Sequence, residues 1–302
     1  MRTKYKVFTA AILVAILALA AGCGGSKGGR AGKVVIGSKE FTESIVLGEM
    51  VAQLIEENTD IQVERKLNLG GTKVNFDGIR NGDLDMYVEY DGTAYTAHLG
   101  HTEPITDRAG FFDQVNKELQ EKFGLTFTAP LGFNNTYTLA MPRKLAEQYG
   151  IETFSDLVPH SRNFAFVGTT EFMARSDGYE PLVEAYGFTF KSAIQMKPGL
   201  RWAAIEDGSV QVIDAFATDG NLKAFDMKIL EDDKDFFPPY NAAVLVRMDT
   251  LEANSGLKEL LDSLGGRLSD EKMQELNYRV AMLEEDPADV ARDFLKSEGL
   301  IP

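Results

Sequence analysis

The stretch IRNGDLDMYVEYDGT, residues 79–93, decides the fold because it has a gap-free counterpart downstream. That counterpart is IEDGSVQVIDAFATD, residues 205–219, and it places Phe216 where the first stretch has Tyr90. Each stretch carries a glycine turn followed by a strand in which side chains alternate between two faces. Chance similarity between two amphipathic strands is the alternative, so a second repeat is needed to decide.

A second pair of similar segments lies upstream of the first pair. VVIGSKEF at 34–41 and FAFVGTTEF at 164–172 share a strand, a glycine, a hydroxyl residue, one variable residue and Glu-Phe. Both pairs occur in the same order along the chain. Together they indicate a duplicated α/β lobe.

Strand and helix signals alternate over residues 34–90. Apolar residues recur on one side of a predicted helix over 42–58, and a shorter helix is predicted over 73–80. IQVERKL at 61–67 and LDMYVEY at 84–90 are typical of strands. This alternation favours βαβ units around a parallel sheet, so the predicted fold class is α/β.

The end of the chain is predicted to return to the first lobe. PPYNAAVLVRM at 238–248 is typical of a strand, and helices are predicted over 251–264, 269–285 and 287–298. We therefore expect one lobe to hold residues 33–137 and 240–302. The other lobe then holds residues 138–239.

Two lobes imply a cleft between them, and ligands of open α/β sheets bind beyond the carboxyl ends of the strands. Tyr90 and Phe216 both stand at such ends. Ser38 and Lys39 follow the strand of the upstream repeat, and Thr169 follows its counterpart. The repeated segments therefore place these side chains where a ligand would lie.

The acids beside Tyr90 suggest acid–base chemistry or a metal, but the pattern does not support either. Asp83 and Asp85 begin like a calcium loop, yet Val88 stands where an EF-hand needs glycine. Alternation along the strand also separates these acids from Tyr90. We expect solvated loop and edge acids here.

His98 and His101 are three residues apart and could share a metal on a helix face. An exposed helix end is the alternative that we favour, because the chain has only three histidines. Neither a glycine-rich phosphate loop nor a G-x-S-x-G elbow occurs. We therefore expect no catalytic residue, no metal, no cofactor and no enzyme activity.

The N-terminus is typical of an exported protein. An apolar run over 7–21 follows three basic residues and is shorter than a bilayer requires, which predicts a signal peptide over 1–22. Cys23, the only cysteine, stands in a position that resembles a bacterial lipobox and is the expected lipidation site. A cysteine that only happens to lie near a cleavage site is the alternative. Residues 23–32 are glycine-rich and predict a flexible tether.

The charge balance argues against nucleic acid as a partner. The formal net charge is -15 at pH 7. Such a surface repels phosphate backbones. With a signal peptide and a lipidated cysteine, the expected location is the outer face of the cell membrane, or the periplasm.

Six motifs then occur in order along nearly the whole mature chain: IGSKEFTES, LNLGGTKVNFDGIRNGDLDMYVEYDGTAY, LGFNNTYTLAM, FMARSDGY, MKILEDDKDFFPPY and RDFLKSEGLIP. Together they resemble the substrate-binding proteins of osmoprotectant ABC importers, which bind glycine betaine, proline betaine, carnitine or choline. The resemblance implies a two-lobe periplasmic-binding-protein fold, type II-like, with the ligand in the cleft between the lobes. It also implies an ABC permease as the partner, and we expect a monomer.

The resemblance further implies an aromatic box around a quaternary ammonium, with residues beside it that hold a carboxylate. Phe216 stands where close relatives often have tyrosine, and Asn135 and Thr136 stand where an aspartate often precedes the box tyrosine. The ligand-binding residues carried over position by position are Tyr90, Tyr137, Phe216, Tyr240, Lys39, Thr93, Arg175 and Asn135.

The chemistry of these residue types agrees with the resemblance. A trimethylammonium group has no hydrogen to donate, so ring faces and not hydrogen bonds select it. Lys39 and Arg175 would pair with a carboxylate, which favours glycine betaine, proline betaine or carnitine over choline. Three rivals stay open: a binder of another small zwitterion or amino acid, a metal-uptake receptor that uses His98 and His101, and a secreted hydrolase.

Overall fold

The computed structural model describes residues 32–102, 105, 108–175 and 177–302. The predicted signal peptide, the lipidation site Cys23 and all but the last residue of the predicted tether lie outside the described residues. None of the described helices is long and apolar enough to cross a membrane.

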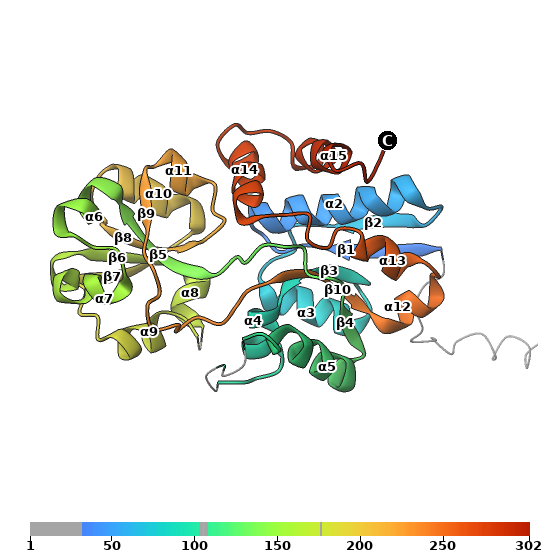
Figure 1. The fold of residues 1–302 in the computed structure, drawn as a ribbon, viewed down its shortest axis with the longest axis horizontal. Coiled ribbons are helices and arrows are strands. Elements are labelled where there is room, and N and C mark those ends of the chain that lie inside the picture. Colours follow the sequence, from blue (N-terminus) through green and yellow to red (C-terminus); the bar gives the residue numbers. More distant parts are fainter. Residues whose placement is uncertain (1–31, 103–104, 106–107, 176) are drawn as a thin grey trace, which may run out of the picture.

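Two five-stranded sheets form the centres of two lobes (Figure 1), which confirms the predicted two-lobe α/β fold. The first sheet has the order β2-β1-β3-β10-β4. Its strands are β1 (Lys33–Gly37), β2 (Gln62–Lys66), β3 (Met86–Tyr90), β4 (Leu125–Phe127) and β10 (Ala242–Arg247). The second sheet has the order β7-β6-β8-β5-β9. Its strands are β5 (Tyr137–Pro142), β6 (Ala165–Thr169), β7 (Ser192–Met196), β8 (Val212–Phe216) and β9 (Met227–Ile229).

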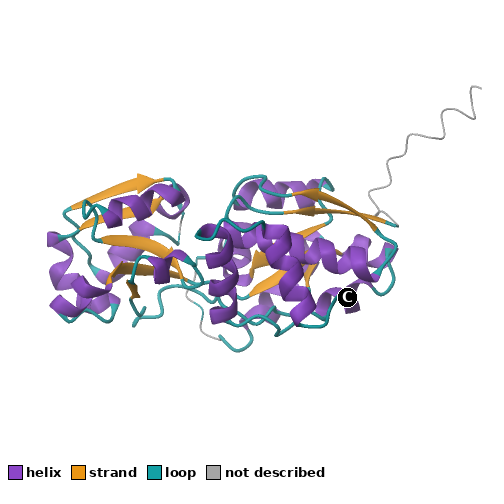
Figure 2. Ribbon diagram, turned by 90° about the horizontal axis from the view of Figure 1, so that it is seen from above, coloured by secondary structure: helices purple, strands orange, loops and turns teal. Residues whose placement is uncertain are grey.

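Helices surround each sheet (Figure 2), so most strands are buried on both faces. The first lobe contains α2 (Thr42–Asn58), α3 (Thr72–Asn81), α4 (Asp91–Thr93), η1 (Ala94–His98), α5 (Phe111–Phe123), α12 (Met248–Ala253), α13 (Leu257–Asp262), α14 (Asp270–Ala281) and α15 (Pro287–Ser297). The second lobe contains α6 (Arg143–Tyr149), α7 (Phe154–Leu157), η2 (Val158–Asn163), α8 (Thr170–Ala174), α9 (Tyr179–Tyr186), α10 (Pro198–Glu206) and α11 (Asn221–Ala224).

The predicted repeat corresponds to one supersecondary unit in each lobe. Gly82 ends α3 with φ of 80°, and Gly208 follows α10 with φ of 75°. Both glycines are therefore in the left-handed region, which residues with a Cβ adopt only at a cost. The strand that follows each glycine lies beside its upstream partner and runs parallel to it, β3 beside β1 and β8 beside β6.

The prediction of a parallel sheet is wrong for one central strand in each lobe. β10 pairs antiparallel with β3 and β4, and β5 pairs antiparallel with β8 and β9. Each of these strands enters its sheet from the other lobe. No helical crossover precedes them, so nothing constrains them to run parallel.

The two connecting segments between the lobes run side by side. Asn134 forms an isolated antiparallel bridge with Asn241, and the Asn135 N–H donates to the Tyr240 carbonyl at 3.1 Å. The lobe boundaries expected after residues 137 and 239 lie at these segments and stay a prediction. Tyr137, expected as the last residue of the first lobe, begins β5 of the second sheet.

The C-terminal helices cover α2 of the first lobe, with α14 on the side that faces the second lobe (Figure 1). The single helix predicted over 251–264 is wrong, because the chain forms α12 and α13 instead. Gly256 lies between them with φ of 82°, a left-handed conformation that interrupts a helix. The β10 strand precedes them and confirms the strand expected within 238–248.

Candidate functional site

A small cavity of about 30 Å³ lies where the two lobes meet the connecting segments. All eight residues predicted as ligand-binding line it, together with three that the sequence reasoning missed. Its lining consists of Lys39, Phe41, Thr72, Tyr90, Thr93, Asn135, Tyr137, Glu171, Arg175, Phe216 and Tyr240. We call this cavity the aromatic box.

The rings of the aromatic box come from strand ends, from one connecting segment and, for Phe41, from the residue that precedes α2. Tyr137 opens β5 and pairs in register with Phe216, which ends β8, so their ring centroids are 4.6 Å apart. Tyr240 meets Tyr137 edge-on at 5.7 Å. Tyr90 ends β3 of the first lobe, and Phe41 stacks on Phe216 at 5.9 Å. Rings from both lobes therefore converge on one cavity.

Lys39 is held by an acid of its own lobe. Its ammonium lies 2.5 Å from Glu89 Oε1 and 5.1 Å from the centroid of the Tyr90 ring. Only 5% of the Lys39 side chain and none of the Glu89 side chain is exposed. A ligand carboxylate would therefore have to share Lys39 with Glu89.

Arg175 has a similar partner. Its Nε and Nη2 donate to the two carboxylate oxygens of Asp177 at 2.7 and 2.6 Å. Its Cζ lies 5.4 Å from the centroid of the Tyr137 ring, and Nη1 is 3.7 Å from Glu171 Oε1. A guanidinium has five N–H donors, so Asp177 does not exhaust it.

The acids next to Tyr90 are buried, and the expectation that they are solvated is wrong for Asp85, Glu89 and Asp91. Asp85 accepts from the Val35 N–H at 2.7 Å, and Asp91 accepts from the Asn241 N–H at 2.8 Å. The expectation failed because helices cover both faces of this sheet, so neither side of β3 faces water.

Glu89 stays ionised despite its burial. Burial alone would raise its pKa, but the charge of Lys39 and the hydrogen bond from His98 outweigh burial and lower the pKa to about 2. The Tyr87 hydroxyl also donates to Glu89, at 3.1 Å. Glu89 thus fixes Lys39 beside the Tyr90 ring.

The two histidines contact different acids. His98 is buried, stacks on Phe76 at 3.7 Å and contacts Glu89 at 3.0 Å, which contradicts the expected exposed helix end. Burial lowers the pKa of His98. His101 instead contacts Glu118 at 2.9 Å. Within the described part of the chain, no group of three or more His, Cys, Asp or Glu side chains could hold a metal.

Sequence reasoning missed a buried carboxylate behind the aromatic box, that of Glu43 in the first turn of α2. It accepts hydrogen bonds from the Tyr90 hydroxyl and from Asn135 at 2.5 and 2.7 Å. Burial raises its pKa, and the hydrogen bonds that it accepts oppose this. Glu171 was also missed, although the repeated Glu-Phe pair at 164–172 was a signal for it.

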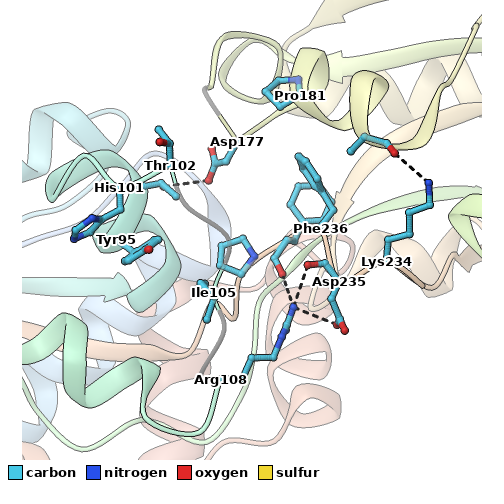
Figure 3. Close-up of a pocket in the computed structure, with 14 residues that line it drawn as sticks. Tyr95, His101, Thr102, Ile105, Arg108, Asp177, Pro181, Lys234, Asp235 and Phe236 are labelled. Carbon is cyan, nitrogen blue, oxygen red and sulfur yellow. Dashed lines mark hydrogen bonds and ion pairs between the residues drawn. The ribbon is translucent and has the colours of Figure 1, made fainter.

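Larger cavities flank the aromatic box between the lobes. One of about 800 Å³ shares Thr72, Glu171 and Arg175 with the box. Another of about 500 Å³ is lined by Asp177, and Figure 3 shows Arg108 paired with Asp235 in its lining. The Thr72 hydroxyl donates to Glu171 at 3.1 Å, so the lobes are in direct contact near the box.

Two α/β lobes, two antiparallel connections and an enclosed site between the lobes define the class of bilobal solute-binding proteins. A family model described as the substrate-binding domain of the ABC-type glycine betaine transport system matches residues 32–297. The chain belongs to this family, and it is a substrate-binding protein of an ABC importer. Such proteins work outside the cytoplasm.

Several curated relatives are similar over most of this chain. The ergothioneine transport permease/ergothioneine binding protein EgtU of Helicobacter pylori is 38% identical over 88% of this chain, which spans about half (48%) of that relative. The glycine-betaine-binding protein of Pseudomonas aeruginosa is 36% identical and is matched over 88% of both chains. The carnitine transport binding protein OpuCC of Listeria monocytogenes is 34% identical over 87% of this chain and 86% of its own.

Solved structures show the same fold. A crystal structure titled as a glycine betaine/carnitine/choline ABC transporter superposes with a TM-score of 0.76 at 34% identity, covering 88% of this chain and 99% of its own. Apo YehZ from Escherichia coli superposes with a TM-score of 0.66 at 27% identity, covering 89% and 99%.

Proposed function

We propose that this substrate-binding protein captures a quaternary-ammonium osmoprotectant that also carries a carboxylate, and delivers it to an ABC permease. Glycine betaine, proline betaine and carnitine have both groups. One observation carries the proposal: five aromatic rings and two cations from separate segments line a single cavity between the lobes.

The rings supply the aromatic faces that attract a trimethylammonium group. Each face of a desolvated tyrosine or phenylalanine attracts such a cation by about 0.5 to 2 kcal/mol. Tyr90, Tyr137 and Tyr240 are all at least 95% buried, so water competes little for their faces. Phe216 lacks only the hydroxyl of a tyrosine and keeps the ring face.

The carboxylate of the ligand is assigned to Arg175, with Lys39 and Thr93 beside it. Arg175 still has N–H donors on Nη1 after Asp177 has taken its Nε and Nη2. Charge-assisted hydrogen bonds of this kind are the stronger ones. Choline has a hydroxyl in place of the carboxylate and gains nothing from the two cations.

Binding requires the lobes to separate and close again. A cavity of about 30 Å³ is roughly tenfold smaller than ordinary ligand pockets. Tyr90 and Thr93 come from the first lobe, whereas Arg175 and Phe216 come from the second. A ligand that contacts both sets favours the closed form by its differential affinity for that form.

A larger betaine is the second candidate. The relative EgtU is named as an ergothioneine-binding protein. Ergothioneine carries the same trimethylammonium and carboxylate groups and adds a thioimidazole ring. The cavity of about 800 Å³ that shares Thr72, Glu171 and Arg175 with the aromatic box offers space for such a substituent.

A thermal-shift panel separates these candidates, because a ligand that binds only the native state raises the melting temperature. We expect glycine betaine, proline betaine or carnitine to raise it, and amino acids and divalent metals not to. A shift with ergothioneine alone would favour the larger betaine. A shift with amino acids and with no betaine would contradict the proposal.

The remaining features concern the whole protein. We infer that Cys23 is acylated and anchors the mature protein at the outer face of the membrane, and that the protein is a monomer without enzyme activity. Cys23→Ser should release the protein into the soluble fraction, as followed by cell fractionation. Recovery of chemically unchanged betaine after incubation is expected of a binding protein, and its turnover would contradict this assignment.

A further inference from the structure

We propose that Glu43 is a positioning residue that couples assembly of the aromatic box to closure of the lobes. This inference rests on the proposed function, because it concerns the same ligand site. Glu43 is distinct from the eight residues assigned to ligand contact and does not line the box itself.

The carboxylate of Glu43 accepts four side-chain hydrogen bonds. Oε1 accepts from the Tyr90 hydroxyl at 2.5 Å and from Asn135 Nδ2 at 2.7 Å. Oε2 accepts from the Thr218 hydroxyl at 2.5 Å and from Asn277 Nδ2 at 2.9 Å. Glu43 is only 2% exposed, so the hydrogen bonds replace the solvation that burial removes.

These four donors come from both sides of the cleft. Tyr90 and Asn277 belong to elements of the first lobe, and Asn135 lies in a connecting segment. Thr218 belongs to the second lobe and lies two residues after the box residue Phe216. One carboxylate therefore joins a box tyrosine of the first lobe to the turn that directly follows a box ring of the second lobe.

That turn, residues 217–220, also docks on α14 of the first lobe. Asn277 Nδ2 donates to the Thr218 carbonyl at 2.9 Å, and Gln274 Nε2 donates to the Ala217 carbonyl at 2.7 Å. A Cβ at Gly220 would overlap the backbone nitrogen of Tyr278, so the two backbones touch. The docked turn brings the Thr218 hydroxyl to Glu43.

The hydrogen-bond pattern matches an acceptor-only group. Asn135 and Asn277 both turn their NH₂ groups to Glu43, while their buried amide oxygens have no hydrogen-bond partner in the structure. Such an orientation leaves two acceptors unsatisfied, at a cost, in order to satisfy the carboxylate. A glutamine at this position would instead point its own N–H groups at donors.

The hydrogen bond between Thr218 and Glu43 should affect how fast the ligand is released. Thr218 reaches Glu43 only when the lobes are closed, so this contact stabilises the closed form both with and without ligand. Its loss should speed opening and dissociation and leave association nearly unchanged. The Tyr90 contact lies within the first lobe and persists in the open form.

Thr218→Val tests the interlobe contact without touching the box, and Thr138→Val is its matched control. Thr138 is equally buried, but its hydroxyl donates to the Leu230 carbonyl at 2.9 Å within the second lobe. Stopped-flow fluorescence and calorimetry with glycine betaine give the rate and equilibrium constants. Thr218→Val should raise Kd and the dissociation rate about tenfold, as expected for a hydrogen bond to a charged group. Thr138→Val should leave both near the wild-type values.

Two further measurements distinguish failure of the proposed Glu43 contact from failure of the proposed function. The double variant Glu43→Gln/Thr218→Val should bind betaine no more weakly than Glu43→Gln alone. The reason is that both changes remove the same hydrogen bond, the one between Glu43 and Thr218. Spin labels at the exposed Glu121 and Glu147 report the distance between the lobes, and Thr218→Val should shift this distance toward the open form even without ligand.

If Thr218→Val keeps the wild-type affinity, dissociation rate and lobe distance, the proposed role of Glu43 is wrong. The proposed function is unaffected by that result. If the wild type binds no betaine, the proposed function fails. In that case an unchanged lobe distance in Thr218→Val contradicts the interlobe contact, and a shift toward the open form supports it.

Discussion

Arg175 is the residue on which ligand selectivity depends most directly in this account. Its guanidinium lies in the aromatic box, backed by Asp177, and it retains donors for a ligand carboxylate. Lys39 lies closer to Tyr90 and is paired with the buried Glu89. Each acid orients its cation and partly offsets its charge, so the box contains cations without a large net positive charge.

Arg175→Ala should weaken glycine betaine at least tenfold and choline much less. The reason is that only glycine betaine carries a carboxylate for the guanidinium. Calorimetry with both ligands measures the two losses. Asp177→Asn is a useful companion, because it alters the orientation of Arg175 but retains its charge. Equal losses for betaine and choline in Arg175→Ala would contradict the assigned carboxylate site.

Glu89 should make stability pH-dependent at acid pH. Its folded-state pKa of about 2 lies below the ordinary 4.5, so its contribution is present above pH 4.5 and is lost as the pH falls from 4.5 toward 2. A shift of this size corresponds to on the order of 3 kcal/mol. Urea unfolding of wild type and Glu89→Gln checks this: the difference in unfolding free energy should shrink between pH 5 and pH 3. A difference that does not change with pH would refute it.

At the scale of elements, the aromatic box depends on close backbone contacts. Gly92 in the short helix α4 packs on the second connecting segment, where a Cβ would overlap the Pro239 carbonyl oxygen and lie 3.0 Å from the Tyr240 ring. Backbone at both sides leaves little room for adjustment. The position of Tyr240 is therefore set by a glycine that does not itself line the aromatic box.

Gly92→Ala should displace Tyr240 and weaken betaine binding about tenfold or more, with some loss of stability. Gly199→Ala is the matched control, because nothing lies within 4 Å of a Cβ there. Calorimetry and thermal unfolding of both variants separate binding from stability. Wild-type affinity in Gly92→Ala would show that the box tolerates a shift of the connecting segment.

The elements were largely predictable from the sequence because their signals are local. The helix over 42–58 and the paired glycines Gly82 and Gly208 follow from periodicity and turn chemistry. The direction of β10 was not predictable, since it depends on how the chain returns from the second lobe. The site was also predictable in part. The repeat and the resemblance pointed to the box residues, whose binding roles stay predictions. The pairing of Lys39 with Glu89 is a long-range contact that no local pattern encodes.

For the whole molecule, the account is a two-state receptor whose lobes share one ligand site. The lobes meet through Thr72 and Glu171, through Thr96 and Asp177, and through Glu43. These contacts surround the aromatic box. In this account, a ligand that fills the box stabilises the closed form.

Ligand should therefore compact the molecule. Small-angle scattering of the wild type should show a smaller radius of gyration with saturating glycine betaine than without it. Thr218→Val should remain more expanded at the same occupancy, because it lacks one contact that favours closure. A radius that does not change on binding would contradict closure as the response to ligand.

The central claim is that the aromatic box selects a methylated ammonium in a zwitterion. Isothermal titration of the wild type with glycine betaine and with glycine tests it most directly, because the two ligands share a carboxylate and differ only in the three methyl groups on nitrogen. The account predicts saturable binding of glycine betaine and at least hundredfold weaker binding of glycine, since the ring faces of the aromatic box prefer the methylated cation. Equal affinity for the two, or binding of glycine alone, would contradict it.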